Sequence, residues 1–247
     1  MRGVTEVGLD LRLGSHDAAA LARAFALDGV VHIPNFLAGD AAERLHAMLR
    51  ARQDWRQVVT SESGTVELDR DTRAAMAPEQ ARALDDAVYA RARTGFQFRF
   101  ETIRVPDAAA DRAASDDPLA ALAEWLSQGE AREFLRAVTG AEDIAFADAQ
   151  GTAYSPGDFL TGHDDRIEGK DRRAAYVLGL TPVWRIEWGG LLLFHGANGH
   201  VSRGLMPSFN SLNLFAVPTM HSVSEVTRAA AYRRYAVTGW LRRGSRA

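Results

Sequence analysis

The sequence has no cysteine, no long apolar run and little net charge. Without cysteine the chain has no disulfide, no thiolate metal site and no cysteine nucleophile, and it fits a reducing compartment. No stretch approaches the length of a membrane span, so we expect no membrane partner. The first ten residues contain Glu6 and Asp10 and no apolar run, which predicts the absence of a signal peptide. Together these absences predict a cytoplasmic soluble protein.

Charge and length narrow the class of protein further. The 247 residues carry 29 basic and 32 acidic side chains, so the net charge of −3 gives no reason to expect nucleic acid as a partner. The hydrophobic fraction of 47% and the charged fraction of 25% are ordinary for a globular protein. Because no repeat, low-complexity run or clear linker interrupts the chain, we expect residues 1–247 to form a single domain. No pattern indicates its oligomeric state.

The two halves of the chain differ in pattern. Residues 1–140 have the apolar spacing of a mainly helical support region with a few short strands, and Ser15 is the expected N-cap of the first helix. Residues 141–243 are a series of short β-type runs separated by turns such as Ser155-Pro156-Gly157 and Gly189-Gly190. Many short strands with such turns indicate a barrel or jelly roll. We therefore expect an α+β fold whose second half carries the functional site.

His163-Asp164-Asp165 is the most informative short motif. On a β-strand, His163 and Asp165 would project from one face. His221, far downstream, could add a second imidazole from a distant strand. Two histidines and one carboxylate on one side of a metal leave open positions and suit non-haem Fe(II) oxygenases. The structural alternatives are a loop hydrogen bond for the triplet and a core histidine, satisfied by a backbone carbonyl, for His221.

The segment from Arg234 to Trp240 alternates in the manner of a strand. Arg234, Ala236, Thr238 and Trp240 would share one face. An arginine on an inward face needs an anionic partner, because an unpaired buried charge is very costly. Its planar fork suits a carboxylate, and Thr238 could add a hydroxyl donor. The alternatives for Arg234 are a salt bridge to an acid of the protein or an exposed position.

These segments together resemble a known family. The run Tyr154…His163-x-Asp165…His221…Arg234-Tyr-Ala-Val-Thr-Gly-Trp resembles the 2-oxoglutarate and Fe(II)-dependent oxygenases, and most of all their prolyl-hydroxylase branch. The segment that begins at Arg234 is similar to the hypoxia-sensing prolyl hydroxylases. The segments around His163 and after His221 are similar to the ribosomal-protein prolyl hydroxylases and their bacterial relatives. The motif match covers roughly residues 150–240.

The resemblance implies a fold, a cofactor and a set of roles. The fold would be a double-stranded β-helix (jelly-roll) core with flanking N-terminal helices. Fe(II) would be held by His163, Asp165 and His221. The co-substrate 2-oxoglutarate would chelate this iron, and its far carboxylate would bind Arg234. Thr238 matches a family position that supports that carboxylate, and Tyr154 matches a tyrosine near the co-substrate and the substrate entrance. Oxygen is the other co-substrate, and ascorbate is a further candidate.

The substrate side of the site is less specific. Gln150, Thr152 and Tyr154 alternate on one strand face and could line the pocket. Arg166 follows the metal motif directly, and it could either contact substrate or be a solvated loop cation. Phe96, Phe98 and Phe100 form a stripe that is most simply interpreted as core.

One departure from the family pattern concerns the co-substrate. Relatives often carry a tyrosine on the strand after the metal loop, where this sequence has Gly179. Tyr176, three residues earlier, should point to the opposite face. The departure affects the expected clamp on 2-oxoglutarate and leaves the iron site unaffected.

The leading hypothesis is a dioxygenase that hydroxylates an unactivated C–H bond, in a prolyl residue or a proline-like substrate, with release of succinate and CO2. The substrate would be a protein or a small molecule. The alternatives are a cupin-like metal hydrolase or isomerase that needs no 2-oxoglutarate, a small-molecule hydroxylase of secondary metabolism, and a non-catalytic module that has kept the barrel.

Overall fold

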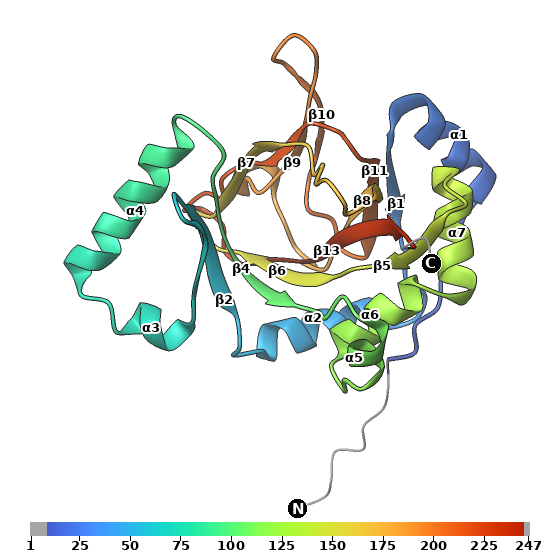
Figure 1. Cartoon of the computed structure of the whole chain (residues 1–247), viewed down its shortest axis with the longest axis horizontal. Helices are drawn as coiled ribbons and strands as arrows, with labels where there is room; N and C mark the ends of the chain where they lie inside the picture. The colour runs from blue at the N-terminus through green and yellow to red at the C-terminus, as the bar shows by residue number, and fades with distance from the viewer. Residues whose placement is uncertain (1–8, 245–247) are drawn as a thin grey trace, which may run out of the picture.

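A computed structural model describes residues 9–244 of the chain. The first eight residues, on which part of the signal-peptide prediction rests, lie outside this range. Within it, antiparallel strands form one curled sheet (Figure 1). The strands are β1 (Val30–Pro34), β2 (Arg56–Ser61), β3 (Gly64–Leu68), β4 (Phe98–Arg104), β5 (Ile144–Ala147), β6 (Gln150–Tyr154), β7 (Phe159–His163), β8 (Arg172–Gly179), β9 (Leu192–His195), β10 (Val201–Leu205), β11 (Ser211–Ala216), β12 (His221–Val223) and β13 (Arg234–Arg243).

The order of the strands confirms the predicted fold class. The main path of the sheet runs β1-β11-β8-β13-β6-β4-β7-β12-β9-β10, and β2, β3 and β5 attach beside it. This curled sheet with flanking helices is consistent with a double-stranded β-helix in an α+β fold. Strands from the first 140 residues complete it: β1 pairs with β11, and β4 lies between β6 and β7. The organisation of residues 1–247 as one oxygenase domain stays a prediction.

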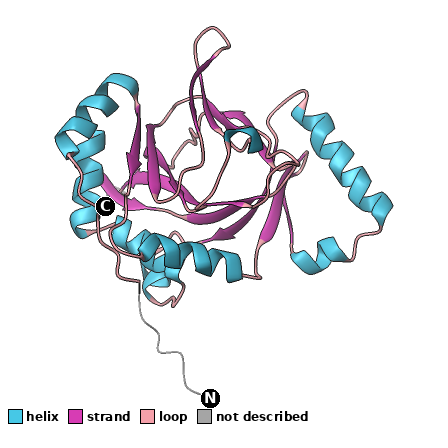
Figure 2. Cartoon of the chain, turned by 180° about the vertical axis from the view of Figure 1, so that it is seen from behind, coloured by secondary structure: helices cyan, strands magenta, loops and turns pink. Residues whose placement is uncertain are grey.

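Helices cover the sheet at both ends (Figure 2). Leu45, Leu119 and Leu135, from three different helices, are almost completely buried in one cluster with Leu178 of β8 and Val237 of β13. The helices and one 3-10 turn are α1 (Ala18–Asp28), α2 (Ala41–Ala51), α3 (Arg70–Ala74), α4 (Pro78–Ala92), α5 (Ala109–Ala113), α6 (Pro118–Leu126), α7 (Gly129–Thr139) and η1 (Ile186–Trp188). In Figure 1, α3 and α4 lie at the end of the sheet opposite α1 and α7. Between residues 9 and 244, none of the helices has the length and apolarity to cross a membrane.

Alternation along β8 separates an outer face from an inner face. Tyr176 and Leu178 belong to the large cluster under the helices, whereas Ala175 and Val177 belong to a separate cluster on the inner side. Tyr176 therefore points away from the inner face, as the sequence predicted, and its hydroxyl donates to the Asp148 carbonyl at 2.8 Å. The inner face is the one that carries the candidate site.

Gly179, at the end of β8, has no room for a side chain. A Cβ atom built there would lie 2.2 Å from the carbonyl oxygen of Ser208, which is backbone and cannot swing away. The tyrosine that the family resemblance led us to expect at this position is therefore incompatible with the path of the Ser208 segment.

We predict that Gly179→Ala destabilises the protein by about 1–3 kcal/mol, because the added methyl group forces the Ser208 backbone to move. Chemical denaturation measures the free energy of unfolding. Gly95→Ala is the matched control, since a Cβ at Gly95 meets no atom within 4 Å. Equal stability of the two variants would contradict the close approach at Gly179.

Candidate metal centre and co-substrate pocket

Two histidines from neighbouring strands face each other at one end of the inner face. His163 is the last residue of β7 and His221 the first of β12, and the antiparallel register makes them direct partners. Their ring centroids lie 4.1 Å apart. This register places side by side two imidazoles that are far apart in the sequence.

Asp165 joins them from a loop rather than from a strand. The sequence argument placed His163 and Asp165 on one strand, but β7 ends at His163 and Asp165 has a positive φ of 63°. Aspartate tolerates this left-handed conformation better than most residues do. The turn brings a carboxylate oxygen to 3.5 Å from Nε2 of His163 and the other to 3.4 Å from Nε2 of His221.

The backbone fixes which nitrogen each imidazole presents. Nδ1 of His163 lies 3.0 Å from the Thr161 carbonyl, and Nδ1 of His221 lies 2.7 Å from the Thr219 carbonyl. A carbonyl can only accept, so each Nδ1 carries the proton and each Nε2 keeps a lone pair directed at the centre of the group. One donor atom from each of the three residues lies within 4.8 Å of the others. The donor set fits a divalent metal such as Fe(II).

Electrostatics keep His221 and Asp165 in the protonation state that binds a metal. Burial, with the adjacent His163, lowers the pKa of His221 to about 4. Burial alone would raise the pKa of Asp165, but its interactions with the two adjacent imidazoles outweigh burial and hold that pKa below its usual value. At neutral pH His221 is therefore neutral and Asp165 ionised.

A cavity of about 690 Å³ opens from this group along the inner face of the sheet. Every site residue that the sequence predicted lines it. These are Gln150, Tyr154, His163, Asp165, Arg166, His221, Arg234 and Thr238.

Arg234 is the buried cation of this cavity. It is only 4% exposed, and its guanidinium carbon lies 4.9 Å from the centre of the Tyr154 ring. Its Nε has no hydrogen-bond partner, and within residues 9–244 it forms no ion pair with an acid. Burial lowers its pKa. Neither structural alternative for Arg234 holds, because it is neither exposed nor paired with a protein carboxylate.

Polar side chains of β4, β6 and β13 form a short hydrogen-bond network. The Gln150 amide nitrogen lies 3.3 Å from the Thr238 hydroxyl, and the Thr102 hydroxyl donates to the Gln150 amide oxygen at 3.1 Å. Two threonines therefore hold Gln150 in place. Arg166 is well exposed, and its backbone N–H donates to Asp164 at 3.0 Å. It lies at the margin of the cavity, where both of its interpretations stay open.

Arg172 and Trp240 also line the cavity, although we predicted no role for either from the sequence. The Arg172 guanidinium carbon lies 3.5 Å from the centre of the Trp240 ring, and its Nη1 donates to the Asp165 carbonyl at 2.8 Å. The alternation of β13 predicted the inward position of Trp240 and did not reveal its partner. Nothing in the local pattern Arg172-Arg173 distinguishes the buried arginine from the surface one.

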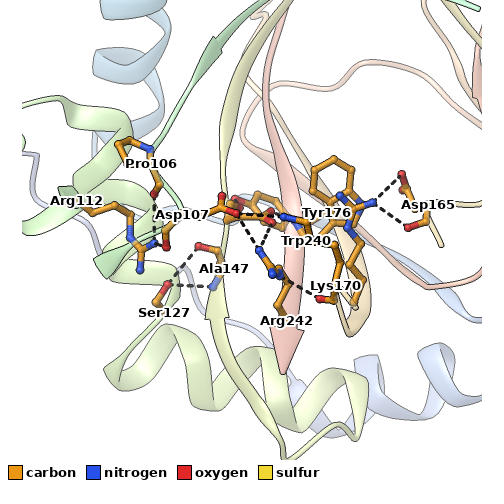
Figure 3. Close-up of polar contacts among 12 residues, drawn as sticks. Pro106, Asp107, Arg112, Ser127, Ala147, Asp165, Lys170, Tyr176, Trp240 and Arg242 are labelled. Carbon is orange, nitrogen blue, oxygen red and sulfur yellow. Dashed lines mark hydrogen bonds and ion pairs between the residues drawn. The ribbon is translucent and has the colours of Figure 1, made fainter. Parts of the chain in front are cut away.

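A series of polar contacts holds Trp240 and the loop after Asp165 in place (Figure 3). The Trp240 backbone N–H donates to Asp148 at 2.7 Å, and Arg242 forms an ion pair with the same carboxylate at 3.5 Å. Arg242 also donates to the Lys170 carbonyl at 3.1 Å, which ties the loop after Asp165 to β13. These contacts fix the segment between the metal group and Arg172.

The phenylalanine stripe has a different role from the one that its pattern suggested. Phe96, Phe98 and Phe100 on and beside β4 line the cavity, and Phe96 is 44% exposed. Phe96 packs on His163 with ring centroids 5.6 Å apart, and Phe100 stacks on Tyr154 at 5.0 Å. The stripe is therefore an aromatic wall of the cavity as well as part of its packing.

Comparisons with known proteins point to the same segment. A family model described as the 2OG-Fe(II) oxygenase superfamily matches residues 149–242. Prolyl 3-hydroxylase OGFOD1 of Xenopus laevis is 35% identical over 117 residues, which are 44% of this chain and 22% of that protein. The chain thus spans about a fifth of the length of the curated relatives that it matches.

Solved structures of prolyl hydroxylases share the fold. A prolyl-4-hydroxylase from Pseudomonas putida has a TM-score of 0.58 at 20% identity, over 92% of this chain and 100% of that one. A prolyl hydroxylase from Trichoplax adhaerens, solved with a peptide fragment of the hypoxia-inducible factor oxygen degradation domain, has a TM-score of 0.56 at 14% identity, over 90% and 87% of the two chains. At these identities the likeness concerns the fold alone.

The matched segment contains all three residues of the candidate metal group. The chain thus matches the 2OG-Fe(II) oxygenase superfamily over this segment. Within that superfamily, its sequence is similar to the curated prolyl 3-hydroxylases. This match implies Fe(II) as the metal and 2-oxoglutarate as the co-substrate. The predictions of family, enzyme class and cofactors are confirmed at this level.

We predict that His221 makes the metal-free protein lose stability in mild acid. The unfolded chain takes up a proton on this histidine near pH 6.5, whereas the folded protein does so only near a pKa of about 4. Stability is therefore complete above pH 6.5 and is lost as the pH falls toward 4. Between pH 7 and pH 5, the free energy of unfolding should fall by roughly 1–2 kcal/mol more than in a His221→Gln variant.

Urea denaturation with a chelator present, at both pH values, measures this difference. The variant is the control for every other titrating group. If the two proteins lose the same amount of stability, His221 is not the source of the pH dependence.

Proposed function

We propose that the protein is a hydroxylase that uses Fe(II), O2 and 2-oxoglutarate, and that its substrate is a prolyl residue or a proline-like molecule. One oxygen atom of O2 enters a C–H bond of the substrate, and the other enters the succinate that forms from 2-oxoglutarate as CO2 leaves. O2 is the oxidant, and a metal held by His163, Asp165 and His221 would activate it for this chemistry. The rest of the proposal concerns what the side chains of the cavity contribute.

The unpaired guanidinium of Arg234 is the observation that carries the proposal. A buried cation with no protein carboxylate is very costly unless a ligand supplies the anion. A dicarboxylate satisfies this requirement, with one end at the metal group and the other at the guanidinium fork. Tyr154 contacts Arg234, and Thr238 lines the same cavity from the same face of β13, so we assign both to the same carboxylate.

The three proposed metal ligands act as a preset group. At neutral pH His221 offers a neutral Nε2 and Asp165 a carboxylate, and the Nδ1 contacts of both histidines direct their Nε2 atoms at the centre of the group. The carbonyls of Thr161 and Thr219 hold the two rings in this orientation. An aspartate at this position also occupies the site that a halide would need, which favours hydroxylation over halogenation.

The aromatic walls favour a small apolar ring as the reacting group. Phe96 and Phe98 form one side of the cavity and Trp240 another, all lining the same space as the metal group. Such walls exclude water from the reacting atoms and pack well on a pyrrolidine ring. The relatives named prolyl hydroxylases add support for this substrate class. Gln150 and Arg166 are the polar groups that we assign to the remainder of the substrate.

The buried charge of Arg234 argues against the cupin-like hydrolase or isomerase, because such an enzyme leaves that charge without a ligand. Between a protein substrate and a small molecule, the 44% exposure of Phe96 favours a protein, since an exposed aromatic at the margin of a site can contact a peptide.

We predict that Arg234→Gln raises the 2-oxoglutarate concentration needed for half-saturation by about 100-fold, because two charge-assisted hydrogen bonds are lost. Anaerobic titration of the Fe(II)-loaded protein with 2-oxoglutarate measures it through the visible charge-transfer band of the chelate. Arg228→Gln, on the exposed segment before β13, is the control and should titrate as the unmodified protein does. A band that survives Asp165→Ala would remove that residue from the metal site.

We predict that the active protein adds one oxygen atom to prolyl residues in a host-cell protein extract. Mass spectrometry of extracts incubated with Fe(II) and 2-oxoglutarate detects the added mass and its position. The Asp165→Ala variant is the control and should leave the extract unchanged. Oxygen gain confined to a metabolite extract would refute the protein-substrate version and support a small-molecule hydroxylase.

A further inference from the structure

A second cavity, of about 710 Å³, lies on the outer face of the sheet under α3 and α4. Four arginines line it: Arg70, Arg73, Arg99 and Arg233. We call it the arginine cleft. Because side chains alternate along β4, Phe98 and Phe100 line the inner cavity while Arg99 and Glu101 line the cleft. The sheet therefore separates the cleft from the metal group.

Three of these arginines share a single carboxylate. Glu101 is 5% exposed, and its Oε1 lies 2.7 Å from Nη1 of Arg73 and 3.7 Å from Nε of Arg70. Its other oxygen contacts Arg233. Nε of Arg233 is buried without a hydrogen-bond partner. One carboxylate cannot balance three guanidiniums, so this part of the cleft holds excess positive charge.

The other acids of the cleft do not remove this excess. Asp85 and Asp158 both pair with Arg99, and the full set is four arginines against three acids. Burial, which outweighs the nearby arginines, also raises the pKa of Asp158 to about 7. Burial and the neighbouring arginines lower the pKa of Arg73. The cleft thus carries a net charge of at least +1, with donors that face open space.

We propose that the arginine cleft binds a small anion that carries carboxylate or phosphate groups. Guanidinium groups converge there from α3 and from the start of β13, and they offer bidentate donors to planar or tetrahedral oxyanions. Arg70 and Arg73 are about one-third exposed, so an incoming anion can reach them without unfolding the cleft. Glu101 holds the arginines in position and competes with the ligand for them.

The cleft ligand would lie behind the strand that carries the co-substrate arginine. Arg233 and Arg234 are consecutive and face opposite sides of the sheet, one lining each cavity. The two anions would therefore be held by adjacent residues on opposite faces of β13. The cleft proposal stands without the proposed hydroxylase function, because none of its residues belongs to the metal group.

Isothermal titration of the full chain with inorganic phosphate, pyrophosphate and citrate, in a low-chloride buffer, tests the proposal. We expect at least one probe to bind, and Arg70→Gln and Arg73→Gln each to weaken it by about tenfold or more. Both residues lie on α3, which has no buried residue, so these variants should fold. Comparison of phosphate with citrate distinguishes a phosphate ligand from a carboxylate ligand.

Three further variants locate the binding. Arg82→Gln, on the exposed face of α4, is the matched control and should bind as the unmodified protein does. Arg234→Gln should also leave binding unchanged; if it alone abolishes binding, the anion occupies the inner cavity and the cleft proposal is wrong. Glu101→Gln removes the competing carboxylate and should tighten binding. Weaker binding in Glu101→Gln, or no binding of any probe to the unmodified protein, would show that the cluster is only a structural ion network.

Discussion

The register between β7 and β12 is the constraint on which the candidate site depends. It makes His163 and His221 direct cross-strand partners, and β12 also pairs with β9 at His221, so their position is set by backbone pairing rather than by the side chains themselves. A slip of one residue would turn one imidazole to the opposite face. The carbonyls of Thr161 on β7 and of Thr219 just before β12 then fix the ring orientations. Position and tautomer therefore come from one piece of backbone.

Alternation on β13 organises the remaining function in the same way. Successive side chains of a strand leave opposite faces, so Arg234, Thr238 and Trp240 face the inner cavity while Tyr235 and Val237 pack in the core beneath the helices. Arg233, one residue earlier, faces the outer cleft. β13 and the residue before it thus supply the proposed co-substrate anchor, a wall of the cavity and a cation of the second cleft.

The sequence predicted the parts of the site that follow from local periodicity. Arg234 and Thr238 could be placed together because a period of two is visible within one segment. His163 and His221 needed the family resemblance, since no local rule pairs distant strands. The contact of Arg172 with Trp240 was not predicted, because β8 and β13 are neighbours in the sheet but far apart in the sequence. The adjacent Arg173 also has the same side chain, so the local sequence does not show which arginine faces the cavity. The fold class was predicted from turn spacing, whereas the insertion of β4 between β6 and β7 is a long-range pairing without a local signal.

Asp165 joins the candidate metal group although the local geometry predicted for it is wrong. The strand spacing that suggested it does not apply, because β7 ends at His163 and a left-handed residue turns the carboxylate back toward both imidazoles. Strained backbone of this kind persists where the surroundings over-determine it. Here Arg172 donates to the Asp165 carbonyl, and Arg242 ties the following loop to β13 at Lys170. The bracing explains why a loop can hold a carboxylate within 3.5 Å of two nitrogens, a precision usually left to strands.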